Sequence, residues 1–135
     1  MPDVQELVKA IARRDKAQVL PTGETAANML GLSTQVPLNY VYLTSGSARK
    51  IMVGKKTVTF KRCVPKNFAC QSMFLAVLIQ AMKAIGQERL TDEHCVIIKG
   101  LLMKNLPIES LDVDMKNAPL WVRHMVYNII KEIDV

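Results

Sequence analysis

Acidic residues are missing from a long stretch of this 135-residue sequence, because no Asp or Glu occurs between Leu38 and Lys66. Metal-dependent nucleases need carboxylates that project from strands to hold their cations, so the stretch does not fit a site of that kind. A phosphate-binding loop of the GxxxxGK type is missing as well. The Ser, His and Asp residues form no recognisable catalytic spacing. We therefore expect no enzyme, no catalytic residues and no cofactor.

Cysteine is scarce, and the three that occur, Cys63, Cys70 and Cys95, form no CxxC pair. An odd number without a pair predicts reduced thiols in a cytoplasmic protein rather than a disulfide framework. Cys95 follows His94, but structural zinc sites usually have paired ligands two to four residues apart. We therefore expect ordinary core or surface residues here and no metal site.

Long apolar runs and aromatic residues are also few. The longest strongly apolar run, Met73 to Ile79, is too short to cross a bilayer, and no basic-then-apolar signal region opens the sequence. We expect no membrane association. Aromatic residues make up 5% of the chain, and we expect Tyr40, Tyr42 and Phe60 to lie in the core. That placement argues against stacking on single-stranded nucleic acid.

What is present is the composition of one globular domain, with 50% apolar and 22% charged residues. Helical spacing of apolar residues after Asp3 and Glu6 predicts a first helix over about 3–15. A short extended piece, "QVLP", leads to a short helix with Thr22 as its cap and Gly31 as its end. Runs rich in Val, Tyr, Ile, Thr and Phe then predict strands at 39–45, 49–53 and 57–63. Turns at 45–47 and 54–55 would join them into an antiparallel meander.

From Pro65 onward the pattern becomes helical. A helix from Asn67 to Ile85 is expected to be buried nearly all round and to end at Gly86. Thr91 would cap the next helix, Pro107 would close it, and the last helix would begin at Asn117 and Pro119. The predicted fold class is therefore α+β, with an N-terminal helix, a small antiparallel β-meander and a run of about three to four C-terminal helices. Its sheet-rich part covers about 18–64 and its helical part about 67–134.

One segment resembles a DNA-reading motif. "ETAANMLGLSTQ" is similar to the first helix and turn of a helix-turn-helix, and a recognition helix would then have to run from about Ser33 to Leu43. Pro37 would interrupt that helix, and "NYVYL" has strand character instead. We expect a short helix that packs on the sheet.

The net charge of +6 is concentrated in the first half of the chain. Residues 1–62 carry ten Lys and Arg against four Asp and Glu, whereas residues 63–135 carry eight of each. The peak is a segment without a counter-ion, and its candidate nucleic-acid-binding residues are Arg49, Lys50, Lys55, Lys56, Lys61, Arg62 and Lys66.

Strand alternation divides this basic segment into two sets. Ile51, Val53, Val58 and Phe60 would share the core side, and Lys50, Thr57, Thr59 and Lys61 would face outward, with Lys55 and Lys56 at the turn. Two interpretations stay open. The lysines protect an exposed strand from edge-to-edge aggregation, or they contact phosphates in a sequence-independent, salt-sensitive way.

Three segments carry a family resemblance: "AIARRDKAQVLPTGETAANMLGLSTQVP", "YVYLTSGSARKIMVGKKTVTFKR" and "PKNF". They resemble the C-terminal domain of AbiEi-like antitoxins of bacterial type IV toxin–antitoxin, or abortive-infection, systems. The resemblance extends from about Val4 to the final helix, and its specific part is Pro21 to Phe68. It implies that residues 1–135 form one such domain.

The resemblance implies a non-enzymatic regulatory antitoxin. Its functional partner would be a nucleotidyltransferase-like toxin that is countered without a stable complex. Relatives usually carry a winged helix before this domain, and the present sequence begins where that helix would have ended, so we do not expect autorepression by this chain alone. The alternative is a nucleic-acid-binding module whose hairpin 49–66 contacts the phosphate backbone of DNA or RNA.

Overall fold

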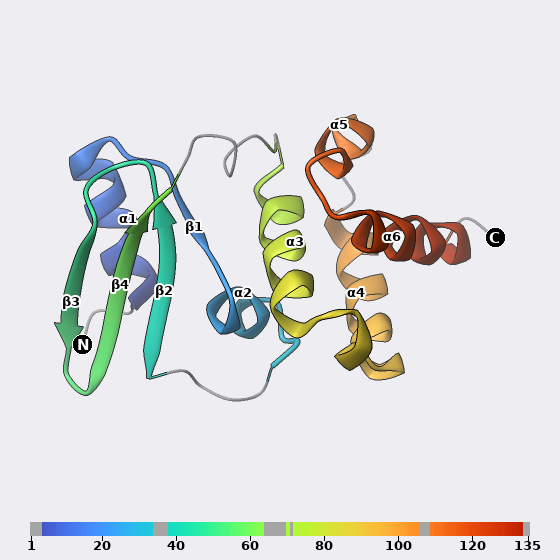
Figure 1. Cartoon of the computed structure of the whole chain (residues 1–135), viewed down its shortest axis with the longest axis horizontal. Helices are drawn as coiled ribbons and strands as arrows, with labels where there is room; N and C mark the ends of the chain where they lie inside the picture. The colour runs from blue at the N-terminus through green and yellow to red at the C-terminus, as the bar shows by residue number, and fades with distance from the viewer. Residues whose placement is uncertain (1–3, 34–37, 64–69, 71, 106–108, 134–135) are drawn as a thin grey trace.

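A helix, a sheet and a group of helices follow one another along the chain (Figure 1). The computed structural model describes residues 4–33, 38–63, 70, 72–105 and 109–133. The α+β class predicted from the sequence is confirmed. The elements are α1 (Val4–Asp15), β1 (Val19–Pro21), α2 (Glu24–Met29), β2 (Asn39–Thr44), β3 (Arg49–Val53), β4 (Lys56–Arg62), α3 (Met73–Ile85), a 3-10 turn η2 (Gln87–Arg89), α4 (Asp92–Asn105), α5 (Leu111–Met115) and α6 (Leu120–Ile133).

The sheet is mixed, and its strand order is β1-β2-β4-β3. β1 pairs antiparallel with β2, β3 pairs antiparallel with β4, and β2 and β4 run parallel, with Tyr42 opposite Phe60. The expected antiparallel meander is therefore wrong, because the strand that follows β2 in sequence does not pair with it. The extended piece "QVLP" contributes the additional strand β1.

The central strand β4 is more deeply buried than the edge strand β3. Val58 and Phe60 are 0% and 3% exposed, whereas β3 has no fully buried residue and exposes Lys50 and Met52. β4 therefore buries two side chains under α1, and the edge strand β3 buries none fully. At the end of β2 the Ser45 N–H donates to the Gln18 carbonyl and the Gln18 N–H donates to Ser45 Oγ. These bonds join the residue after β2 to the residue before β1, on the edge of β2 that pairs with β1. The other edge of β2 pairs with β4.

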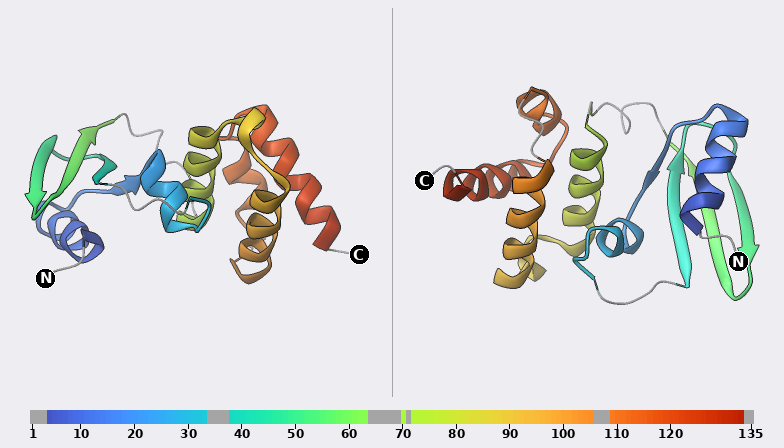
Figure 2. Two further views of the ribbon diagram at one scale, coloured as in Figure 1. Left: turned by 90° about the horizontal axis from the view of Figure 1, so that it is seen from below. Right: turned by 180° about the vertical axis from the view of Figure 1, so that it is seen from behind.

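Helix α1 covers one face of the sheet. It lies behind the strands in Figure 1 and in front of them in the right panel of Figure 2. Its buried residues Val4, Val8 and Ile11 pack against Tyr42, Val58 and Phe60, and the two rings stack with centroids 6.0 Å apart. The predicted core side of the strands is thereby confirmed.

The second core belongs to the helices. α3 runs through the middle of the molecule, and Leu75, Leu78, Ala81 and Met82 are fully buried. α2 packs on α3 and on β2, and the Val41 N–H donates to Thr25 Oγ1. β2 begins at Asn39, so the recognition helix of a helix-turn-helix is absent among the described residues of 33–43. The short-helix interpretation is confirmed.

Helix ends follow the sequence signals only in part. Gly86 ends α3, and Thr91 Oγ1 accepts from the His94 N–H at the start of α4, as expected. α3 begins at Met73 with Ser72 as its cap, and the expected earlier residues 67–69 and 71 lie outside the described residues, as does Pro107. Thr22 does not cap α2: Gly23 holds that position, and Thr22 Oγ1 donates to Gln80 Oε1 instead.

Helix α5 is an element that the sequence did not predict. Its residue Asp114 is 0% exposed, and Asp114 Oδ2 accepts a hydrogen bond of 2.9 Å from the Ser72 N–H. This bond places a carboxylate beside the first turn of α3, where the helix dipole favours negative charge. Asp114 thus holds α5 against the start of α3.

Candidate nucleic-acid interface

The face of the sheet opposite α1 is partly uncovered. Over β3 and β4, no helix of the described chain packs on this face, which we call the open face (Figures 1 and 2). Alternation and register place eight side chains on this side of the sheet: Asn39, Val41, Leu43, Lys50, Met52, Thr57, Thr59 and Lys61. Leu43 is partly buried against the helical core, and the other seven form the open face. In one row across the sheet Lys50 lies opposite Thr59, which lies opposite Val41. The outward positions expected for Lys50, Thr57, Thr59 and Lys61 are confirmed.

Positive charge on the open face has no acidic neighbour within the sheet, because β1 to β4 contain no Asp or Glu. Lys50 and Lys61 are diagonal neighbours on adjacent strands, and both are exposed. Among the ion pairs between described residues, none involves Lys50, Lys55 or Lys61. The mutual repulsion of these cations would fall if they bound an anion.

Polar donors accompany the lysines. Thr59 Oγ1 donates to Asn39 Oδ1 at 3.3 Å. This bond uses the oxygen of the Asn39 side chain and not its N–H donors. Hydroxyl and amide donors beside lysines are the groups with which proteins contact phosphate oxygens and sugars. Asn39 enters this face only because β2 runs parallel beside β4, so hairpin reasoning from the sequence missed it.

The remaining candidate cations do not join the open face. Arg49 Nη2 pairs with Asp15 Oδ2 at 2.9 Å on the α1 side of the sheet. Lys56 Nζ lies 5.7 Å from the centroid of the Tyr40 ring, also on that side. Arg62 alternates to the same side as Phe60 and is exposed at the end of β4.

Lys55 occupies the β3–β4 turn, and Lys66 lies outside the described residues. Gly54 precedes Lys55 with φ of 62°, the sign that a two-residue type II′ turn requires at its first position. The turn therefore projects Lys55 at the tip of the hairpin. Of the seven predicted cations, the register brings Lys50 and Lys61 together, and Lys55 lies at the tip of the same hairpin, at the other end of β4 from Lys61.

Aromatic stacking is not available on the open face. Tyr42 and Phe60 are each 3% exposed on the α1 side, and Tyr40 is partly buried there. The arrangement can therefore hold a phosphate backbone through charge and hydrogen bonds, but it offers no ring on which a base could stack.

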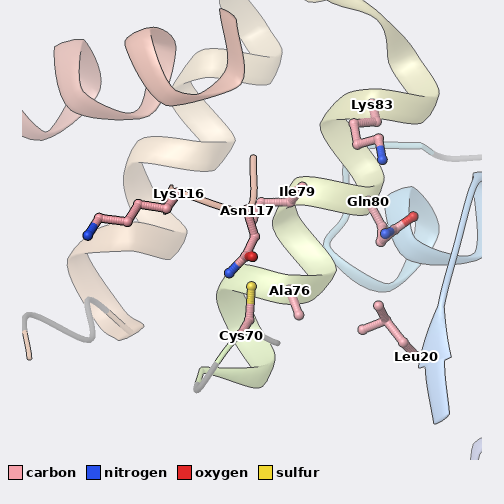
Figure 3. A pocket seen from close by; sticks show the side chains of 8 residues that line it. All are labelled: Leu20, Cys70, Ala76, Ile79, Gln80, Lys83, Lys116 and Asn117. Atoms are coloured by element: carbon pink, nitrogen blue, oxygen red, sulfur yellow. The ribbon is translucent and has the colours of Figure 1, made fainter. Parts of the chain in front are cut away.

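A groove of about 320 Å³ lies along α3 (Figure 3). Its lining residues are Leu20, Cys70, Ala76, Ile79, Gln80, Lys83, Lys116 and Asn117. Gln80 and Lys83 are polar positions one turn apart on an otherwise apolar helix, and they are the sequence signal that could have located it. Its lining is part apolar and part polar, and the groove could admit a small molecule.

The thiols of Cys70 and Cys95 show no sign of activation. Burial raises the pKa of Cys70, the charge of Asp114 raises it further, and a hydrogen bond with Asn117 lowers it. Burial likewise raises the pKa of Cys95. A raised pKa keeps a thiol protonated and therefore a poor nucleophile and metal ligand. Within the described ranges, no three His, Cys, Asp or Glu side chains gather as metal ligands would.

Comparison with known proteins gives one match. Residues 1–111 match a protein family whose description reads "Family of unknown function (DUF6088)". The matched stretch ends at the first residue of α5, so it includes α1 to α4 and the whole sheet. The chain matches no curated protein and no solved structure. No helix in the described part is long and apolar enough to span a membrane.

Proposed function

The chain belongs to the DUF6088 family, and we propose that it is a non-enzymatic antitoxin or regulatory protein whose open face contacts nucleic-acid phosphates. The observation that carries the phosphate contact is the pair of neighbouring cations Lys50 and Lys61 on a helix-free surface whose strands hold no acidic residue, with Lys55 at the tip of the same hairpin. Thr57, Thr59 and Asn39 add neutral donors to the same surface.

The regulatory role is supported by the resemblance of Pro21 to Phe68 to AbiEi-like antitoxins. In that role the chain would counter a nucleotidyltransferase-like toxin in the cytoplasm, where thiols such as Cys63 stay reduced. Contact with the RNA or DNA on which such a toxin acts would not require a stable complex between the two proteins. The alternative is a nucleic-acid-binding module with no toxin partner, and the same surface supports it.

The binding test compares two triple variants with equal loss of charge. The open-face variant is Lys50→Gln, Lys55→Gln and Lys61→Gln. The matched control, Lys9→Gln, Arg13→Gln and Arg14→Gln, removes three exposed cations from α1 on the opposite side of the sheet. Titration of duplex DNA and of RNA with unrelated sequences, at several salt concentrations, measures affinity and its salt slope.

We expect the open-face variant to bind every sequence more weakly and to lose about 0.9 units of salt slope per phosphate contact on duplex DNA. The α1 control should keep most of the slope. Equal losses in both variants would mean that net charge alone drives binding. Unchanged binding in the open-face variant would exclude this face as the interface.

Rescue of growth separates the two roles. If the chain is an antitoxin, it should protect cells that express a nucleotidyltransferase-like toxin encoded next to it, and the open-face variant should protect them less. Nucleic-acid binding without any rescue would favour the simple binding module. Rescue that survives loss of the open face would place the antitoxin activity elsewhere on the chain.

A further inference from the structure

Helix α4 carries apolar side chains on two opposite sides. Ile98 and Leu102 are 0% exposed and belong to the core, whereas Val96 and Met103 are 70% and 64% exposed. In the right panel of Figure 2, α4 lies in front of α6, and no other described segment passes over it. An edge helix that is apolar on its outer side as well as its inner side is typical of one that packs against a partner.

Gly100 lies between Val96 and Met103 on that outer side, near the middle of the helix. A Cβ added there would meet nothing within 4 Å, so the fold of a single chain does not require glycine at this position. Glycine in a helix interior weakens the helix relative to alanine. What the missing side chain permits is close approach of another backbone to the outer side of α4.

Charged residues on the outer side favour a second α4 in the opposite direction. Glu93 in the first turn and Lys104 in the last turn lie on the same flank of the apolar stripe, by the 100° spacing of helical residues. Antiparallel helices would bring Glu93 of each copy near Lys104 of the other. A parallel two-fold pair would instead place Glu93 of each copy on the edge that holds Asp92 of the other copy and away from its Lys104.

We propose that the outer side of α4, formed by Glu93, Val96, Gly100, Met103 and Lys104, binds a second copy of this chain. The two α4 helices pack antiparallel about a two-fold axis that passes near Gly100. One surface is then used twice, as closed symmetric dimers require. A 14-residue helix is only about 21 Å long, so the interface is small and the dimer forms in a concentration-dependent way. This proposal is independent of the nucleic-acid interface.

Sedimentation of the whole chain over a range of concentrations tests it. The parent should shift from monomer to dimer, and the variant Val96→Lys with Met103→Lys should stay monomeric. The matched control is Met73→Lys with Leu120→Lys, which places two lysines at apolar residues of similar exposure, 61% and 60%, on α3 and α6. This control should dimerise as the parent does. Thermal melts verify that all variants fold.

Charge exchange then tests the antiparallel geometry. Glu93→Lys alone and Lys104→Glu alone should each weaken the dimer at least several-fold. Equimolar mixing of the two variants should restore association, because each contact again joins opposite charges. The chain that carries both changes should also dimerise. A lysine at position 93 that has no effect, or a mixture that stays monomeric, would overturn the antiparallel pair.

A parent that remains monomeric up to about 1 mM would overturn self-association altogether, because a Kd above about 1 mM is too weak for a specific dimer. The outer side of α4 would then belong to a different protein. A dimer that persists in the Val96→Lys, Met103→Lys variant would also overturn the proposal, because its interface would lie elsewhere.

Discussion

Leu78 shows what a single residue contributes to this molecule. It is 0% exposed in the middle of α3 and packs within the helical core. We expect Leu78→Ala to lower the free energy of unfolding by about 2–5 kcal/mol, because it removes buried methyl groups and leaves a cavity. Urea denaturation measures this loss. Met73→Ala, on the same helix but 61% exposed, should change stability by no more than about 0.5 kcal/mol. Similar losses at the two positions would contradict the assigned burial.

Tyr127 gives a pH-dependent test at the same scale. Its hydroxyl donates to Asp112 Oδ1, and this bond, helped by burial and by the charge of Asp112, raises the pKa of Tyr127 above 10.0 while Arg123 opposes the rise. Asp112→Asn should move that pKa back toward 10.0, measured by ultraviolet titration with Tyr127→Phe to identify the signal.

The sign of the stability effect follows from the same shift. A pKa raised in the folded state stabilises the fold fully below the unfolded pKa and loses this contribution as pH rises through the folded pKa. From neutral pH to about 10 the parent should therefore keep a constant advantage over Asp112→Asn, and the advantage should shrink above that. Asp112 is exposed and Tyr127 only partly buried, so solvent screening keeps the effect small. An advantage that grows with pH would contradict it.

At the scale of elements, two glycines should respond to alanine in opposite directions. Gly54 has φ of 62° in the β3–β4 turn, and Ala there costs roughly 1–2 kcal/mol because its Cβ crowds the backbone. Gly100 lies within α4 with open space around it, so Ala should stabilise the monomer by about 0.5–1 kcal/mol. Chemical denaturation at low protein concentration compares them. Stabilisation by Gly54→Ala would mean that the turn has a different backbone geometry.

Elements also mark the limit of what the sequence could predict. Period-2 alternation correctly gave the sides of Lys50, Thr59 and Lys61, because a strand's faces depend only on its own residues. Pairing of β2 with β4 depends on which strand buries more surface against α1, and no local pattern contains that information. The same holds for Thr22, whose hydroxyl bonds to Gln80, 58 residues away, instead of capping α2. α5, with 5 residues, is too short for a helical period to appear.

The candidate interface was predicted in the same partial way. The run of cations located the correct hairpin, but it could not distinguish Lys50 and Lys61 from Arg49, which an ion pair with Asp15 engages. That partner lies 34 residues earlier, on α1. Asn39 was not expected on the face because its neighbours depend on the parallel register of β2 beside β4.

At the scale of the whole molecule, two cores of unequal size divide the chain. Among the described residues, the helical core holds nineteen buried side chains and the core under α1 holds six. We expect the amides of α1 to exchange hydrogen faster than those of α3, a helix of similar length, because less apolar surface holds α1 in place. Hydrogen exchange followed by NMR measures both. Equal protection would show that the two cores open as one unit.

Absence of a metal-ligand cluster in the described ranges gives a second prediction for the whole chain. The thermal unfolding midpoint should be the same with and without a strong chelator, because no bound ion would be removed. A loss of several degrees on chelation would mean that a metal contributes to the fold.

The central position of β4 has a consequence for synthesis on the ribosome. The chain emerges from its N-terminus, so β1 and β2 can pair early, but the inner edge of β2 has no partner until Arg62 has appeared. β3 and β4, joined by a two-residue turn, can form their hairpin within microseconds and must then dock as a unit against β2. Any nascent chain that stalls before residue 62 therefore presents an open strand edge, ready to pair with another chain.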